Sequence, residues 1–177
     1  LRVNCVLQSM SILKVKINGK SKNYRTVWMD EHKNSVKMIN QPLLPHEFKI
    51  IELNDYKETA DAIRDMKTRG AGAIGATGAY GFAQGCVAYE GKEYGFWDYM
   101  ENVYNTLKNT RPTAVDLVNG MEYVKGEMEN GSNLKEYKEI SVDAAVRFSD
   151  EQVKELENIG RYGEKLIKNG DNLETHC

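Results

Sequence analysis

Residues 69–81 read RGAGAIGATGAYG, a run rich in glycine and alanine with a single arginine at its head. Small side chains let a backbone come close to a ligand or to another helix. An arginine beside exposed backbone N–H groups is a common arrangement for holding an anion. The residues alone therefore support two interpretations: an oxyanion or phosphate site headed by Arg69, or a helix–helix contact with Arg69 on the surface.

The same run is expected to continue as a helix to about residue 89. Five glycines lie from Gly70 to Gly81, and each weakens a helix by about 1 kcal/mol relative to alanine. Close approach of backbones at the centre of a helical cluster would offset this. The run is not a Walker A loop, because no Gly-Lys-Ser/Thr closes it. Residues 70–75 match G-x-G-x-x-G, but a helix-like segment precedes them where a dinucleotide-binding fold has a strand.

The part of the chain before this run alternates apolar and polar residues in the manner of short strands. Asn18-Gly19 can form a first turn, and residues 32–35 a second. We expect an antiparallel meander whose strands cover residues 13–17, 24–29, 36–39 and 48–53.

After these strands the apolar residues recur at helical spacing. Asn54 or Asp55 can cap a first helix, and Gly70 is expected to end it. Thr110 is a plausible cap for a later helix that has Pro112 in its first turn. The remaining helices are expected over residues 94–108 and 134–170, the latter with a fresh start at residues 149–151.

Residues 173–177 read as the beginning of a strand. A helix followed by a strand is the usual entrance to a parallel α/β domain. We therefore expect an α/β protein in which a second domain starts near the end of this sequence.

Composition sets further limits. The chain has 177 residues, 28% charged and 41% apolar, which is typical of a soluble globular protein. Its net charge of −2 gives no basic field for nucleic acid, and no apolar run is long enough to span a membrane. Cys5, Cys86 and Cys177 are odd in number and form no CxxC, which argues against a disulfide framework or a zinc ribbon. We expect a cytoplasmic protein without a metal site.

Two further residues are candidates for chemistry. Arg111 precedes Pro112 at an expected helix start, where its charge opposes the helix dipole unless an anion is bound. A solvated loop arginine is the alternative. Cys177 follows Thr175 and His176 at the end of the expected strand, outside which α/β folds bind ligands. It could be a nucleophile, a proton carrier or a small buried apolar residue.

Three segments, residues 69–75, 110–115 and 175–177, occur in this order at wide separations. Together they resemble the methylthioribose-1-phosphate isomerase family. That family is related to ribose-1,5-bisphosphate isomerases and to the alpha, beta and delta subunits of translation initiation factor 2B. The resemblance covers most of the chain from about Met10 onward, and further matching segments are residues 25–28, 41–47 and 62–66.

The resemblance implies an N-terminal α+β domain over residues 10–148, with a small antiparallel sheet and helices. It also implies that residues 149–177 are the connecting helix and first strand of a truncated Rossmann-like domain. A homodimer without nucleic-acid or membrane partners is expected. The catalytic aspartate of the family would lie beyond residue 177, so this chain is expected to be inactive alone.

The resemblance further implies an aldose–ketose isomerase that acts on a phosphorylated sugar, most readily 5-methylthioribose 1-phosphate, without metal or other cofactor. Arg69, Gly70, Ala71 and Arg111 would bind the substrate, and Cys177 would be catalytic. A ribose-1,5-bisphosphate isomerase and a regulatory subunit like those of initiation factor 2B are the alternatives. A catalytic thiol at Cys177 would have a chemical reason only in an isomerase.

Overall fold

The computed structural model describes residues 13–17, 20–30 and 34–174. The chain divides into two compact units, Leu1–Arg25 with Glu151–Cys177, and Thr26–Asp150. The first unit contains an antiparallel hairpin of β1 (Leu13–Ile17) and β2 (Lys20–Tyr24), in which Leu13 pairs with Tyr24. It also contains the last part of α5 (Leu134–Gly163) and a short 3-10 helix, η3 (Glu164–Leu166).

The second unit is built on a three-stranded antiparallel sheet in the order β3-β4-β5. The strands are β3 (Val27–Asp30), β4 (Ser35–Ile39) and β5 (Ile50–Leu53), and the 3-10 helix η1 (Gln41–Leu43) follows β4. The expectation of one meander is wrong, because the strand expected over residues 24–29 is divided. Tyr24 pairs with β1 in one sheet, whereas Val27 pairs with Met38 in the other.

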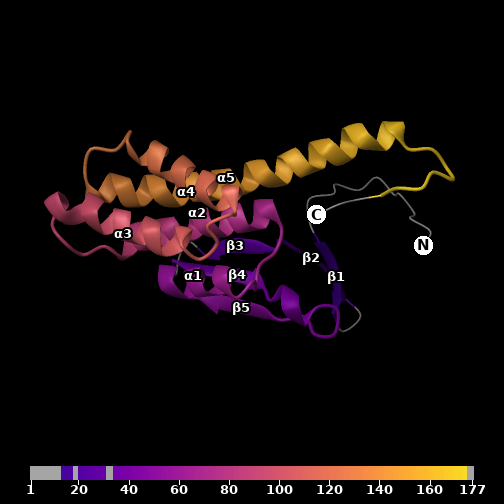
Figure 1. The fold of residues 1–177 in the computed structure, drawn as a ribbon, viewed down its shortest axis with the longest axis horizontal. Helices are drawn as coiled ribbons and strands as arrows, with labels where there is room; N and C mark the ends of the chain where they lie inside the picture. The colour runs from indigo at the N-terminus through magenta and orange to yellow at the C-terminus, as the bar shows by residue number, and fades with distance from the viewer. Residues whose placement is uncertain (1–12, 18–19, 31–33, 175–177) are drawn as a thin grey trace. The chain divides into compact units, whose positions relative to one another are not determined.

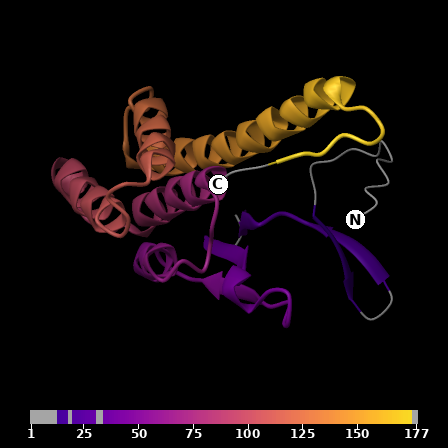
Figure 2. The ribbon, with the colours of Figure 1, turned by 45° about the vertical axis from the view of Figure 1, so that its right-hand side comes forward.

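One face of this sheet forms part of the hydrophobic core. In the observed register Val27 lies opposite Met38, Met29 opposite Val36, and Val36 opposite Leu53. All five of these side chains are buried. Helix α2 (Ala71–Ala88) packs on β3 and β4. Figures 1 and 2 show α2, α3 (Phe96–Lys108), α4 (Val115–Met128) and the first half of α5 on one side of the sheet.

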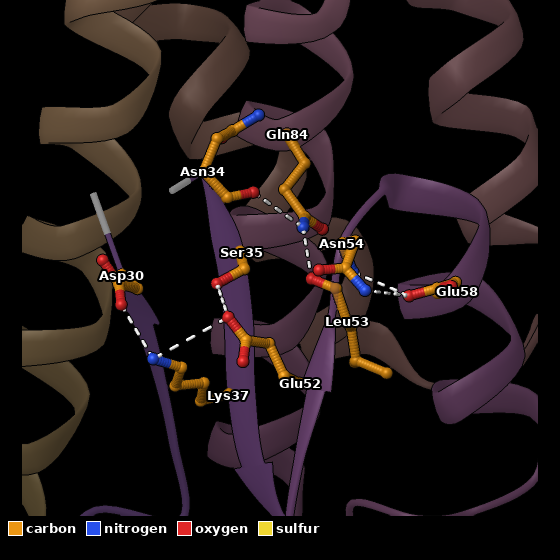
Figure 3. Close-up of polar contacts among 9 residues, drawn as sticks. All are labelled: Asp30, Asn34, Ser35, Lys37, Glu52, Leu53, Asn54, Glu58 and Gln84. Atoms are coloured by element: carbon orange, nitrogen blue, oxygen red, sulfur yellow. Dashed lines mark hydrogen bonds and ion pairs between the residues drawn. The ribbon is translucent and has the colours of Figure 1, made fainter. Parts of the chain in front are cut away.

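The other face carries a charged cluster that the sequence analysis did not identify. Lys37 lies opposite both Trp28 and Glu52. Its Nζ is 2.7 Å from Asp30 Oδ2 and 3.8 Å from Glu52 Oε1 (Figure 3). Ser35 Oγ donates to Glu52 Oε1 at 2.8 Å. The hydrogen bond to Asp30 raises the pKa of Lys37, which therefore stays charged. Because its members lie on β3, β4 and β5, this cluster links the three strands.

Helix α1 (Tyr56–Arg64) begins as expected. The side chain of Asp55 accepts from the backbone N–H groups of Lys57 and Glu58, both at 2.8 Å. The expectation that Gly70 ends this helix is wrong, because α1 ends at Arg64. Gly70 instead is the N-cap of α2, with φ of 92°, a left-handed conformation that glycine adopts without strain.

Helix α2 is buried along most of its length, from Ile74 to Cys86. This confirms that the glycine- and alanine-rich run lies at the centre of a helical cluster. A polar tie fixes the helix to its neighbours. Thr59 Oγ1 of α1 donates to Gln84 Oε1 at 2.6 Å. Gln84 Nε2 donates to the carbonyl oxygens of Leu53 and Asn34 (Figure 3). Gln84 is 1% exposed, and these three hydrogen bonds satisfy its amide group inside the core.

Helix α3 is preceded by the 3-10 helix η2 (Glu93–Gly95), in agreement with the expected helix over residues 94–108. The start of α4 differs from the expectation. It begins at Val115 with Ala114 as its N-cap, so neither Thr110 nor Pro112 belongs to it. Thr110 Oγ1 instead donates to Leu107 O at 2.6 Å and closes the end of α3.

Helix α5 runs without interruption through residues 149–151, where a fresh start was expected. Ser149 is 3% exposed and lies on the buried face of α5 with Ala145 and Phe148. Its side chain therefore packs in the core and does not cap a new helix. The helix ends at Gly163, seven residues before Gly170. Gly170 has φ of 99° in a turn where Asp171 N–H donates to Lys168 O.

Leu173 and Glu174 lie in no strand, and the rest of the strand expected over residues 173–177 lies outside the described residues. Among the helices that the structure describes, none has an apolar stretch long enough to cross a membrane.

Candidate functional site

The N-terminus of α2 carries three of the expected site residues. Arg69, Gly70 and Ala71 are all exposed. The first hydrogen bond within the helix runs from Ile74 N–H to Gly70 O at 2.9 Å. The N–H groups of residues 71–73 precede this bond, and no side chain caps them. Such donors, together with the positive end of the helix dipole, favour an anion.

Helix α4 packs against this end of α2 with almost no space between the backbones. A Cβ atom added at Gly75 would lie 2.8 Å from Asp116 O, and one added at Gly120 would collide with Gly75 O. One added at Gly78 would lie 2.5 Å from the side chain of Leu117. Glycine is therefore required at this crossing, and the helix–helix interpretation of the run is correct for its second and later turns.

This crossing brings the two arginine segments to neighbouring helix ends. Gly75 lies about 6 Å along the α2 axis from Ala71, at the usual rise per residue. Asp116, which contacts it, is in the first turn of α4, five residues after Arg111. Arg111 is half-buried, and its carbonyl oxygen accepts from Ala114 N–H at 3.0 Å. Arg111 was expected at a helix start, but it lies four residues before Val115, in the turn that leads into α4.

The two N-termini supply the chemistry of an anion site. Helix α4, like α2, has no side-chain N-cap, since Ala114 precedes it. Two guanidinium groups and the backbone donors of two helix starts would suit a phosphate dianion. Asp116 is the acidic residue of the α4 first turn, and its Oδ1 accepts from Asn119 Nδ2 at 3.2 Å.

The expected catalytic residue, Cys177, lies outside the described residues with Thr175 and His176. Cys86, in contrast, is a core residue. It is fully buried in α2, and burial raises the pKa of its thiol to about 11, with a hydrogen bond to Ser141 acting in the opposite direction. A thiol protonated at neutral pH is a poor nucleophile, so Cys86 is structural.

Thr68 and Gln41 adjoin the candidate site. The sequence analysis named Gln41 only as part of the matching segment 41–47, and it assigned a role to neither residue. Thr68 directly precedes Arg69 and is fully buried. Gln41 N–H donates to Lys67 O at 3.1 Å. Both are common residue types in loops, so only the buried side-chain oxygen of each, seen in the fold, identifies them. Over residues 13–17, 20–30 and 34–174, no group of three His, Cys, Asp or Glu is placed to hold a metal ion.

Comparison with known proteins shows similarity over most of the chain. The sequence profile described as "Initiation factor 2 subunit family" matches residues 67–177. A putative methylthioribose-1-phosphate isomerase of Pyrococcus horikoshii is 42% identical over 151 residues, which are 83% of this chain and 41% of that protein. Methylthioribose-1-phosphate isomerase 1 of Pseudothermotoga lettingae is 36% identical over 156 residues, 88% of this chain and 45% of that protein.

Two solved structures share the fold. The crystal structure of 5-methylthioribose 1-phosphate isomerase from Pyrococcus horikoshii matches with a TM-score of 0.76 and 39% identity, over 82% of this chain and 41% of that one. Subunit delta of the translation initiation factor eIF-2B from A. fulgidus matches with a TM-score of 0.74 and 32% identity, over 83% and 43%. The chain thus spans less than half the length of these relatives.

Proposed function

We propose that the complete protein, whose chain belongs to the initiation factor 2 subunit family, is an aldose–ketose isomerase of a phosphorylated ribose. The substrate would be 5-methylthioribose 1-phosphate, the compound in the names of the isomerases that this chain resembles at 36% and 42% identity. The family is the one that the sequence motifs indicated. Conversion of a ribose 1-phosphate to the ribulose 1-phosphate requires ring opening before hydrogen can move between C1 and C2.

The observation that carries the proposal is the paired helix start. Arg69, Gly70 and Ala71 stand at the exposed N-terminus of α2, and Arg111 leads into α4, which packs on it. We assign the phosphate to these residues. A dianion would gain charge-assisted hydrogen bonds from both guanidinium groups and from the α2 backbone. Such binding would hold the sugar in place while its ring opens.

Cys177 is proposed as the catalytic thiol, and an aspartate beyond residue 177 as its acid–base partner. Residues 10–148 would form the N-terminal domain, and residues 149–177 the connecting helix and first strand of a Rossmann-like domain. The proposal includes a cytoplasmic homodimer that needs neither a metal nor another cofactor. In this arrangement the chain holds the phosphate site but only part of the catalytic machinery.

A regulatory subunit is the second candidate. Its support is the match to eIF-2B subunit delta, whose TM-score of 0.74 is close to the 0.76 of the isomerase. A ribose-1,5-bisphosphate isomerase would use the same phosphate site, so the two isomerases differ only in the substrate that is turned over.

The deciding experiment is an isomerase assay of the complete protein. It would be offered 5-methylthioribose 1-phosphate and ribose 1,5-bisphosphate separately, and ketose formation would be followed. We expect turnover of the methylthioribose compound. Turnover of the bisphosphate alone would identify the protein as a ribose-1,5-bisphosphate isomerase. A folded protein that converts neither would favour the regulatory subunit.

A further inference from the structure

Three buried side-chain atoms have no hydrogen-bond partner among the residues that the structure describes: Asn34 Oδ1, Gln41 Oε1 and Thr68 Oγ1. An unpaired buried polar atom destabilises a fold, so each of the three needs an explanation. Asn34 lies near Gln84 at the far end of α2, since its carbonyl oxygen accepts from Gln84 Nε2. The other two atoms belong to segments that meet at the near end.

Gln41 and Thr68 belong to two segments that a backbone hydrogen bond joins. Gln41 N–H donates to Lys67 O at 3.1 Å, and Thr68 is the residue that follows this acceptor. Their side chains are chemically complementary, because a hydroxyl can donate and an amide oxygen accepts. Buried polar groups of this kind are commonly satisfied by each other or by an internal water molecule.

Thr68 is also the last buried residue before the anion site. Residues 65–70 lie outside both α1 and α2, and Met66 and Gly70 have φ of 55° and 92°. The backbone of this connection is anchored at Lys67, whose N–H donates to Ala62 O and whose O accepts from Gln41. A side-chain tie at Thr68 would extend that anchor to the residue next to Arg69.

We propose that Thr68 and Gln41 are positioning residues for the anion site. One internal water molecule that bridges Thr68 Oγ1 and Gln41 Oε1 by hydrogen bonds holds Arg69 and the first turn of α2 in the geometry that binds phosphate. Neither side chain touches the ligand. The inference rests on the proposed function in so far as the ligand is a phosphate ester, but inorganic phosphate is enough to test it.

The test compares five variants of the complete protein: Thr68→Val, Thr68→Ser, Gln41→Met, the double variant with both Gln41→Met and Thr68→Val, and Thr59→Val. Thr59 is the matched control, because it is also fully buried but its hydroxyl donates to Gln84, far along α2 from Arg69. Phosphate affinity is measured by calorimetry, and the amide shifts of Gly70 and Ala71 by NMR. Thermal midpoints are recorded for every variant.

We expect Thr68→Val to weaken phosphate binding about tenfold, the effect of losing one hydrogen bond of about 1.4 kcal/mol. Thr68→Ser keeps the hydroxyl and should bind within about twofold of the parent. Thr59→Val should lower the thermal midpoint but bind phosphate normally. Because the two residues act as one unit, adding Gln41→Met to Thr68→Val should weaken binding no further.

The inference is overturned if Thr68→Val binds phosphate like the parent, if Thr59→Val weakens binding equally, or if the effects at positions 41 and 68 add. It is also overturned if the parent protein binds no phosphate. The turnover assay stands apart from these results. Phosphate binding that depends on Thr68 in a protein without isomerase activity would support the inference while the proposed function fails.

Discussion

Arg69 is the residue on which the proposed function depends most directly. Its guanidinium group is exposed beside the uncapped start of α2. Arg64, five residues earlier, is also exposed, but it lies on α1 and pairs with Asp61 at 2.6 Å. Substitution of either arginine by a neutral residue removes one positive charge, but only Arg69 lies at the N-terminus of α2.

We expect Arg69→Gln to raise the KM for the sugar phosphate by about tenfold to a hundredfold. A hydrogen bond to a charged group contributes about 1.5–3 kcal/mol, and 1.4 kcal/mol is a factor of ten. Arg64→Gln should leave KM within about twofold, because exposed ion pairs contribute little. Steady-state kinetics of both variants measure this, and equal effects would show that net charge alone matters.

Cys86 gives a prediction about pH. Burial raises the pKa of its thiol from 9.0 to about 11 in the folded chain. The folded state therefore holds its proton more tightly than the unfolded state. The stabilisation is complete below about pH 9 and is lost as the pH rises through about 11.

Wild-type protein should consequently lose roughly 2 kcal/mol more stability between pH 9 and 11 than Cys86→Ala, since one pKa unit corresponds to about 1.4 kcal/mol. Urea unfolding at several pH values measures the difference. Tyr99 and Tyr104 also have raised pKa values. Both tyrosines are present in the wild type and in the variant, so the comparison between the two proteins isolates Cys86. Parallel curves for the two proteins would contradict the assignment.

The crossing of α2 and α4 depends on glycine for a different reason than the N-cap does. At Gly120 a Cβ atom would meet Gly75 O, which belongs to a backbone that cannot move aside easily. At Gly126, on the same helix, a Cβ atom would meet nothing within 4 Å. The two positions separate close packing from helix propensity.

Gly120→Ala should destabilise the fold by about 1–3 kcal/mol, the usual effect of overpacking. Gly126→Ala should stabilise it by about 0.5–1 kcal/mol, because alanine is the better helix former. Chemical denaturation of both variants provides the measurement. If both substitutions stabilise the protein, the backbones of α2 and α4 do not meet as the structure has them.

The helices could be predicted from sequence better than their ends. The buried helix over residues 71–88 and the Asp55 cap follow from local pattern, because small residues and capping residues act within one turn. The role of Gly70 could not be assigned in the same way, because a glycine with positive φ suits either the end of one helix or the approach to the next. The chain leaves α1 at Arg64 and still needs that conformation six residues later, at Gly70.

The strands and the site show the same limit. The division at Arg25 depends on which strand each side pairs with, which is information from distant residues. Arg69 and Arg111 could be selected by residue type and context. That their helices meet depends on glycines 45 positions apart, Gly75 and Gly120, and Thr68 and Gln41 became visible only through their burial. Residue type and local context identified the arginines of the candidate site, whereas the residues that position them depend on tertiary packing.

At the scale of the molecule, the hydrophobic core of the residues that the structure describes lies in one of the two units. Every buried member of the core cluster falls between Val27 and Phe148. The part of α5 after Asp150 has exposed apolar side chains instead, with Leu156 65% and Ile159 68% exposed. A helix segment stabilised mainly by its own hydrogen bonds is marginal in water.

A fragment of residues 26–150 should therefore fold cooperatively, with a thermal midpoint close to that of the 177-residue chain. In the longer chain, amide hydrogens of residues 151–163 should exchange much faster than those of residues 138–150 on the same helix. Their opening needs only the loss of the helix end, whereas the earlier residues open with the core. Hydrogen exchange followed by NMR distinguishes the two segments. Equal protection along α5, or a fragment that fails to fold, would mean that the first unit contributes to the core.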